Sequence, residues 1–175
     1  MKISALRKVA AALLAGALLA TVPATAAPAA ARQVAPAFLL RNMNSGLCLT
    51  LAGGGTTLNL SAVQYRCDNH RSRRWQLNNI AGTNTWFIRN VNSGLCLTIA
   101  GGNTGLNQIA VQYRCDSHLS RRWRFVATGF GTNRIVNVNS GLCLTIAGGN
   151  TGLNQVAVQY TCDSHRSRTW SLGVG

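Results

Sequence analysis

The chain has 175 residues, 17 of them Lys or Arg and only three Asp or Glu, so its formal net charge at pH 7 is +14. Its length allows one compact domain. It contains no glutamate, and its three aspartates lie far apart in the sequence, which argues against a glycosidase that works with two adjacent carboxylates.

The N-terminal segment has the pattern of a secretory signal peptide. Residues 1–26 begin with basic residues, continue with an apolar run and end in small residues, and the run is too short to span a membrane. We expect cleavage after this segment, a flexible Ala/Pro-rich leader at 27–37, and a secreted, extracellular protein without membrane insertion. Loss of three of the 17 basic residues, Lys2, Arg7 and Lys8, lowers the net charge from +14 to +11.

The rest of the chain consists of three copies of one sequence. The motif NSGLCL begins at Asn44, Asn92 and Asn139, and two cysteines in each copy are separated by 19 residues. Disulfides persist in exported proteins, and only one of the fifteen possible pairings of six cysteines treats the three copies alike. The predicted disulfides join Cys48 with Cys67, Cys96 with Cys115, and Cys143 with Cys162.

In chain order, each copy contains four segments typical of β-strands. In the first copy they are 38–41, 47–51, 62–67 and 74–77, where apolar and polar residues alternate. No copy alone has enough apolar surface to bury, so the copies must pack against each other. We predict an all-β fold of twelve strands in one domain at 38–175. Its expected lobes are roughly 38–83, 84–131 and 132–175.

The repeated cysteines, the SGLCL motif after the first strand and a Trp at the end of each copy resemble the ricin-type β-trefoil lectin family. The resemblance covers the whole chain after the leader. It implies a β-trefoil with three pseudo-symmetric lobes, one disulfide inside each lobe, and one shallow carbohydrate pocket for each lobe. It also implies carbohydrate binding. Because the chain lacks a pair of neighbouring carboxylates, we expect a binding protein and not an enzyme.

The sugar-binding residues of that family are only partly kept. The family carboxylate, two residues after the first cysteine, is a threonine here, and the pocket glutamine is a valine. The asparagine before the last Trp is a serine, the glutamine of the QxW motif is an arginine, and the aromatic platform is a tyrosine. In lobe order these positions are Thr50, Thr98 and Thr145; Val63, Val111 and Val158; Ser72, Ser120 and Ser167; Arg73, Arg121 and Arg168; and Tyr65, Tyr113 and Tyr160.

An aspartate follows the second cysteine of every lobe and leaves two hypotheses open. Strand alternation places Thr50, Tyr65 and the start of the Asp68 loop close together, so Asp68 could replace the missing carboxylate while a sugar ring stacks on Tyr65. In the second hypothesis, which does not exclude the first, Asp68 pairs with Arg73, because a largely buried arginine needs a counter-charge. The candidate carbohydrate-binding residues are Thr50, Tyr65, Asp68, Asn69, His70, Thr98, Tyr113, Asp116, His118, Thr145, Tyr160, Asp163 and His165.

Three further residue types recur once in each lobe. The histidines follow the aspartates by two residues and are His70, His118 and His165. Histidine and aspartate can bind metals, but we favour hydrogen bonding within the loop. No metal or cofactor is predicted. The tryptophans Trp75, Trp123 and Trp170 are expected in the core. The glutamines Gln64, Gln112 and Gln159 face away from the tyrosines and are expected to bond buried backbone groups.

The predicted function is carbohydrate binding by a secreted monomer with up to three weak sites. The alternative is a cationic protein that binds anionic polymers, such as acidic glycans or nucleic acid. The salt dependence of binding distinguishes these two functions, because binding to anionic polymers weakens as ionic strength rises. The arginines concerned are Arg73, Arg74, Arg121, Arg122, Arg124, Arg166 and Arg168.

Overall fold

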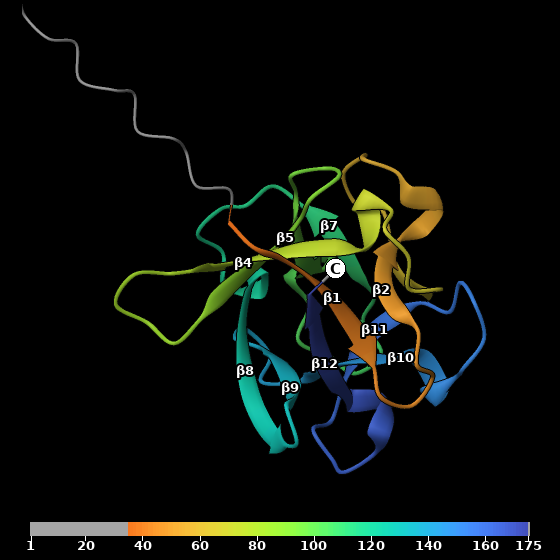
Figure 1. Cartoon of the computed structure of the whole chain (residues 1–175). Coiled ribbons are helices and arrows are strands. Elements are labelled where there is room, and N and C mark those ends of the chain that lie inside the picture. Colours follow the sequence, from red (N-terminus) through yellow and green to blue (C-terminus); the bar gives the residue numbers. More distant parts are fainter. Residues whose placement is uncertain (1–34, 175) are drawn as a thin grey trace, which may run out of the picture. The chain divides into compact units, whose positions relative to one another are not determined.

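The computed structural model describes residues 35–174, which form an all-β structure with six short 3₁₀ helices (Figure 1). The predicted signal peptide and most of the predicted leader lie outside the described residues. Within 35–174, no helix has the length and apolar character needed to cross a membrane. The strands are β1 (Ala37–Asn42), β2 (Cys48–Leu51), β3 (Ala62–Tyr65), β4 (Arg74–Asn79), β5 (Trp86–Asn90), β6 (Cys96–Ile99), β7 (Ala110–Tyr113), β8 (Arg122–Gly129), β9 (Thr132–Asn137), β10 (Cys143–Ile146), β11 (Ala157–Tyr160) and β12 (Thr169–Val174). The 3₁₀ helices are η1 (Ala52–Gly54), η2 (Arg71–Arg73), η3 (Ala100–Gly102), η4 (Leu119–Arg121), η5 (Ala147–Gly149) and η6 (Arg166–Arg168).

Six strands, two from each lobe, close into an antiparallel barrel. The pairing runs from β1 to β4, β5, β8, β9 and β12, and β12 pairs with β1 again. The other six strands form the hairpins β2–β3, β6–β7 and β10–β11. Closure leaves the barrel without a free edge. The predicted β-trefoil with four strands in each lobe is confirmed.

The hairpins meet each other across the lobe boundaries. Single bridges join Ser61 with Val111, Val63 with Val156, and Ile109 with Val158. In the first hairpin Cys48 lies opposite Tyr65, and Thr50 lies opposite Val63. The predicted strand at 62–67 ends at Tyr65, because β2 begins at Cys48 and offers the later residues no partner.

The core is built from the inward face of every strand. Its largest side chains are the three tryptophans, each at most 1% exposed, as the sequence predicts. Each indole N–H donates to the carbonyl oxygen of a leucine in the same lobe over 2.9 Å, so burial leaves no unpaired indole donor. The three predicted disulfides are formed, which is typical of an oxidising environment.

Candidate functional site

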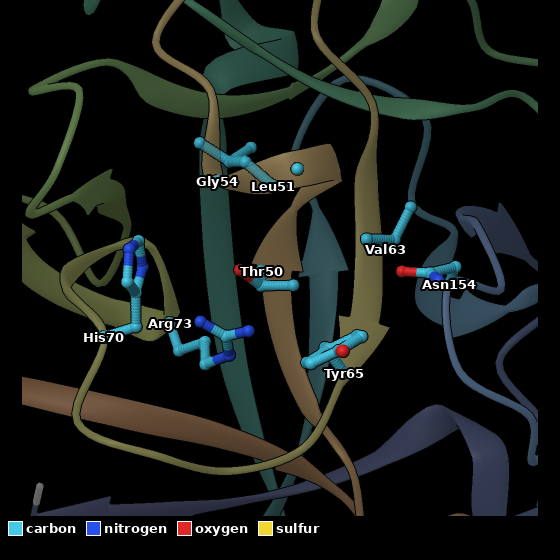
Figure 2. A pocket seen from close by; sticks show the side chains of 9 residues that line it. Thr50, Leu51, Gly54, Val63, Tyr65, His70, Arg73 and Asn154 are labelled. Atoms are coloured by element: carbon cyan, nitrogen blue, oxygen red, sulfur yellow. The ribbon is translucent and has the colours of Figure 1, made fainter.

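A pocket lies beside the hairpin of each lobe. The volumes are about 370, 370 and 410 Å³ in the first, second and third lobes, within the usual range for small-molecule sites. Figure 2 shows the first pocket, whose lining includes Thr50, Val63, Tyr65, His70, Arg73 and Asn154. The corresponding residues of the second pocket are Thr98, Val111, Tyr113, His118, Arg121 and Asn59. Those of the third are Thr145, Val158, Tyr160, His165, Arg168 and Asn107.

The tyrosine and the arginine of each pocket contact each other. Tyr65 ends β3, and the guanidinium of Arg73 lies over its ring, 4.8 Å from the centroid. The distance is 4.9 Å in the other two lobes. Attraction between a cation and an aromatic face orients both groups. The half-buried tyrosine therefore forms one wall of the pocket, and its contact with the arginine fixes the orientation of both side chains.

The aspartates hold these arginines by ion pairs. The distance from an arginine nitrogen to Oδ1 of the aspartate is 3.3, 3.2 and 3.1 Å in the three lobes. The Arg73 side chain is only 12% exposed, whereas that of Asp68 is 50% exposed. Oδ1 of Asp68 also accepts the backbone N–H of His70 over 2.8 Å. The hypothesis that Asp68 pairs with Arg73 is confirmed, and the carboxylate lies beside the pocket lining.

The histidine and the threonine of each pocket are joined through the serine. The backbone N–H of Ser72 donates to Nδ1 of His70, and the Ser72 hydroxyl lies 2.8 Å from the same nitrogen. Because a backbone N–H can only donate, we assign the imidazole proton to Nε2. Thr50, which is 3% exposed, donates its hydroxyl proton to the Ser72 carbonyl over 3.2 Å. The hydroxyl proton of Thr50 is therefore used inside the protein, while Nε2–H of His70 remains a donor.

One polar side chain of each pocket, an asparagine, comes from a neighbouring lobe and was not predicted. Asn154 lies in the β10–β11 loop of the third lobe but lines the pocket of the first. Gln64 holds this loop: its Nε2 donates to the carbonyl oxygens of Asn150 and Gly152 over 2.9 and 2.7 Å. As predicted, this glutamine is fully buried and bonds backbone groups. No spacing within one repeat reveals a contact between lobes, so the sequence carried no signal for this asparagine.

Two kinds of predicted site residue lie outside the pocket linings. The first kind is the aspartates, which form ion pairs with the pocket arginines but do not line the pockets themselves: Asp68, Asp116 and Asp163. The other is Asn69, whose Oδ1 accepts a hydrogen bond from Arg74 over 3.0 Å. The predicted threonines, tyrosines and histidines do line the pockets. Within residues 35–174, no three His, Cys or Asp side chains are grouped as a metal site would require.

Each histidine packs against a glycine with a positive φ. In the second lobe, Gly102 has φ +67°, and a Cβ atom added there would lie 2.8 Å from Cε1 of His118. We expect Gly102→Ala to lower the free energy of unfolding by about 2 kcal/mol, part of it from the positive φ and part from displacement of the imidazole. Chemical denaturation measures the loss. The control is Gly141→Ala, because Gly141 has φ +73° and an open Cβ position; equal losses in both variants would contradict a role for the imidazole contact.

The structure is a β-trefoil with one similar pocket, walled by a tyrosine, in each of its three lobes. The model of the family described as ricin-type beta-trefoil lectin domain-like matches residues 30–112, 79–160 and 120–174. The chain therefore belongs to this family. A search of curated proteins returned no match.

Solved structures with the same fold share little sequence with the chain. ThreeFoil, a designed threefold-symmetric protein, has a TM-score of 0.76 and 22% identity over 78% of this chain and 97% of its own. The exo-beta-1,3-galactanase 1,3Gal43A from Clostridium thermocellum has a TM-score of 0.79 and 22% identity, covering 82% of this chain and 31% of the galactanase. The C-half of the earthworm R-type lectin, solved with GalNAc, has a TM-score of 0.63 and 10% identity over 80% and 99% of the two chains. At these identities the likeness concerns the fold alone.

Proposed function

We propose that this protein is a secreted, non-catalytic lectin that binds carbohydrate in the three pockets. The observation that carries the proposal is the threefold recurrence of one pocket with a tyrosine wall and polar side chains around it. Tyrosine offers a sugar ring an apolar surface, and a few directed hydrogen bonds then select the hydroxyls. Membership of the lectin family and the GalNAc complex of the earthworm lectin support this proposal.

The pockets are suited to weak binding at each site and stronger binding to a polymer. Each is shallow and partly open, and all three belong to one β-trefoil domain. Several weak sites in one body raise the overall affinity for a repeating polysaccharide without any new contact. We therefore propose a monomer that binds polysaccharides or cell-surface glycans. Its β-trefoil domain spans residues 38–175, and its signal peptide, residues 1–26, is removed.

The experiment that tests the function is a pull-down of the oxidised protein with a panel of neutral and acidic polysaccharides at about 0.15 M and about 1 M salt. Retention on a neutral glycan at the higher salt supports the proposal that the protein is a lectin. Retention only on acidic polymers at the lower salt would assign binding to the arginines instead, and retention on none would contradict the proposal.

The aspartates are proposed to orient the arginines and not to contact the sugar. The triple variant Asp68→Asn, Asp116→Asn, Asp163→Asn keeps the acceptor oxygen but removes the charge, so we expect glycan retention at 1 M salt to fall by less than about threefold. A loss as large as that caused by removal of the tyrosines would show that a carboxylate contacts the ligand. The same pull-down measures both variants.

A further inference from the structure

In each pocket the polar side chains supplied by the pocket's own lobe are mainly donors. Arg73 has no acceptor atom, and Nε2 of His70 carries the imidazole proton. The Thr50 hydroxyl is almost fully buried and bonded to the Ser72 carbonyl. Oδ1 of Asp68 is bound by Arg73 and by the His70 backbone N–H, and this carboxylate does not line the pocket. Among the side chains of the pocket's own lobe that line it, the tyrosine hydroxyl is therefore the one exposed acceptor for the proton of a sugar hydroxyl.

The asparagine from the neighbouring lobe offers a free hydrogen-bond acceptor. In Figure 2 the carboxamide of Asn154 is directed toward the pocket. Among residues 35–174 this side chain has no hydrogen-bond partner, although a carboxamide carries one acceptor oxygen and two N–H donors. The side chains of Asn59 and Asn107 are also without a partner in this part of the chain, and they line the second and third pockets.

The backbone of this asparagine is held in place independently of its side chain. Asn154 has φ +59°, a left-handed conformation that Asn and Gly adopt more readily than other residues. Its backbone N–H donates to the carbonyl oxygen of Gln64 over 2.9 Å. Gln64 directly precedes Tyr65 in β3, so one strand positions both the aromatic wall and the loop from the next lobe. The loop position is thus fixed while the carboxamide remains available to a ligand.

We infer that each pocket is a composite site of two lobes, in which the asparagine of the neighbouring lobe accepts a hydrogen bond from a hydroxyl of a neutral sugar. The inference rests on the proposed function. The contributions run in a ring: Asn154 of the third lobe serves the first pocket, Asn59 of the first serves the second, and Asn107 of the second serves the third. No single lobe contains a complete site, so binding requires the closed trefoil.

The test is the variant Asn154→Gly in the full mature chain, because glycine keeps the positive φ and the backbone hydrogen bond but removes the carboxamide. ¹⁵N-labelled protein is titrated separately with D-galactose, N-acetyl-D-galactosamine, D-glucose and D-xylose, and amide shifts are followed at all three pockets. We expect the dissociation constant at the first pocket to rise about three- to tenfold, the effect of one or two hydrogen bonds. The second and third pockets should be unchanged and act as controls in the same molecule.

A second variant separates ligand contact from loop structure. Asn154→Asp keeps an acceptor oxygen and tolerates the same backbone conformation, so binding at the first pocket should be retained. If Asn154→Gly leaves the first pocket unchanged, or weakens the third pocket instead, the composite site is wrong and the proposed function stands. If no sugar shifts any pocket amide of the unmodified protein, both are overturned.

Discussion

The triple variant Tyr65→Ala, Tyr113→Ala, Tyr160→Ala is expected to lose retention on every neutral glycan that the unmodified protein binds at 1 M salt. Each substitution removes the aromatic wall of one pocket and the surface against which the arginine is held. Loss of an aromatic contact lowers the affinity of a single site roughly tenfold. Because the three sites act together on a polymer, the effects multiply. Quantitative pull-down measures the loss.

The matched control is the triple tyrosine-to-phenylalanine variant, which keeps the rings and removes only the hydroxyls. We expect it to retain most of the binding, because the ring supplies the apolar contact. Single Tyr→Ala variants should lose binding in part, with similar losses in the three lobes. Undiminished retention by the triple alanine variant, in a protein that still unfolds cooperatively, would place the carbohydrate site outside the pockets.

The variant Gln112→Leu is expected to lower the free energy of unfolding by about 3 kcal/mol. Gln112 is fully buried, and its Nε2 donates to the carbonyl oxygens of Gly55 and Thr57 over 3.2 and 2.7 Å. Its Oε1 accepts the hydroxyl of Ser93 over 2.6 Å. Leucine has a similar volume but leaves these groups without partners, and each unpaired buried polar group costs about 1–3 kcal/mol. Guanidinium denaturation measures the change.

The same variant should also weaken sugar binding at the second pocket, because Gln112 holds the loop that carries Asn59. Gln108→Leu is the control: the Gln108 side chain makes a single long contact, 3.5 Å, with the carbonyl oxygen of Leu106. Its loss of stability should stay within about 0.5 kcal/mol. Equal effects of the two substitutions would mean that Gln112 does not anchor the loop.

The strands, the disulfides and the core could be predicted because their determinants are local or repeated. Alternating apolar residues around Cys48 and Tyr65 specify strand faces, and the spacing of 19 residues in all three copies selects one pairing of the cysteines. The burial of Trp75 and Gln64 follows from the same alternation. The ending of β3 at Tyr65 was missed because it depends on where the partner strand begins.

The site was only partly predictable, since its hydrogen bonds are made between side chains whose directions depend on packing. The sequence left Asp68 with two roles, and the structure places its carboxylate against Arg73, where the largely buried guanidinium needs a counter-charge. The sequence predicts the hydroxyl of Thr50 as a ligand contact, but in the structure this hydroxyl donates its proton to the carbonyl oxygen of Ser72. His70 lines the pocket with Nε2 because its Nδ1 accepts the Ser72 backbone N–H.

The sequence by itself therefore determined the repeat, the twelve strands, the three disulfides and the threonine, tyrosine and histidine of each pocket, because these depend on periodicity within one lobe. Only the tertiary structure decided that Asn154 from one lobe stands in the pocket of another. That contact arises when the barrel closes and Gln64 binds the neighbouring loop. Closure joins residues about ninety positions apart in the chain, and no local pattern records such a pairing.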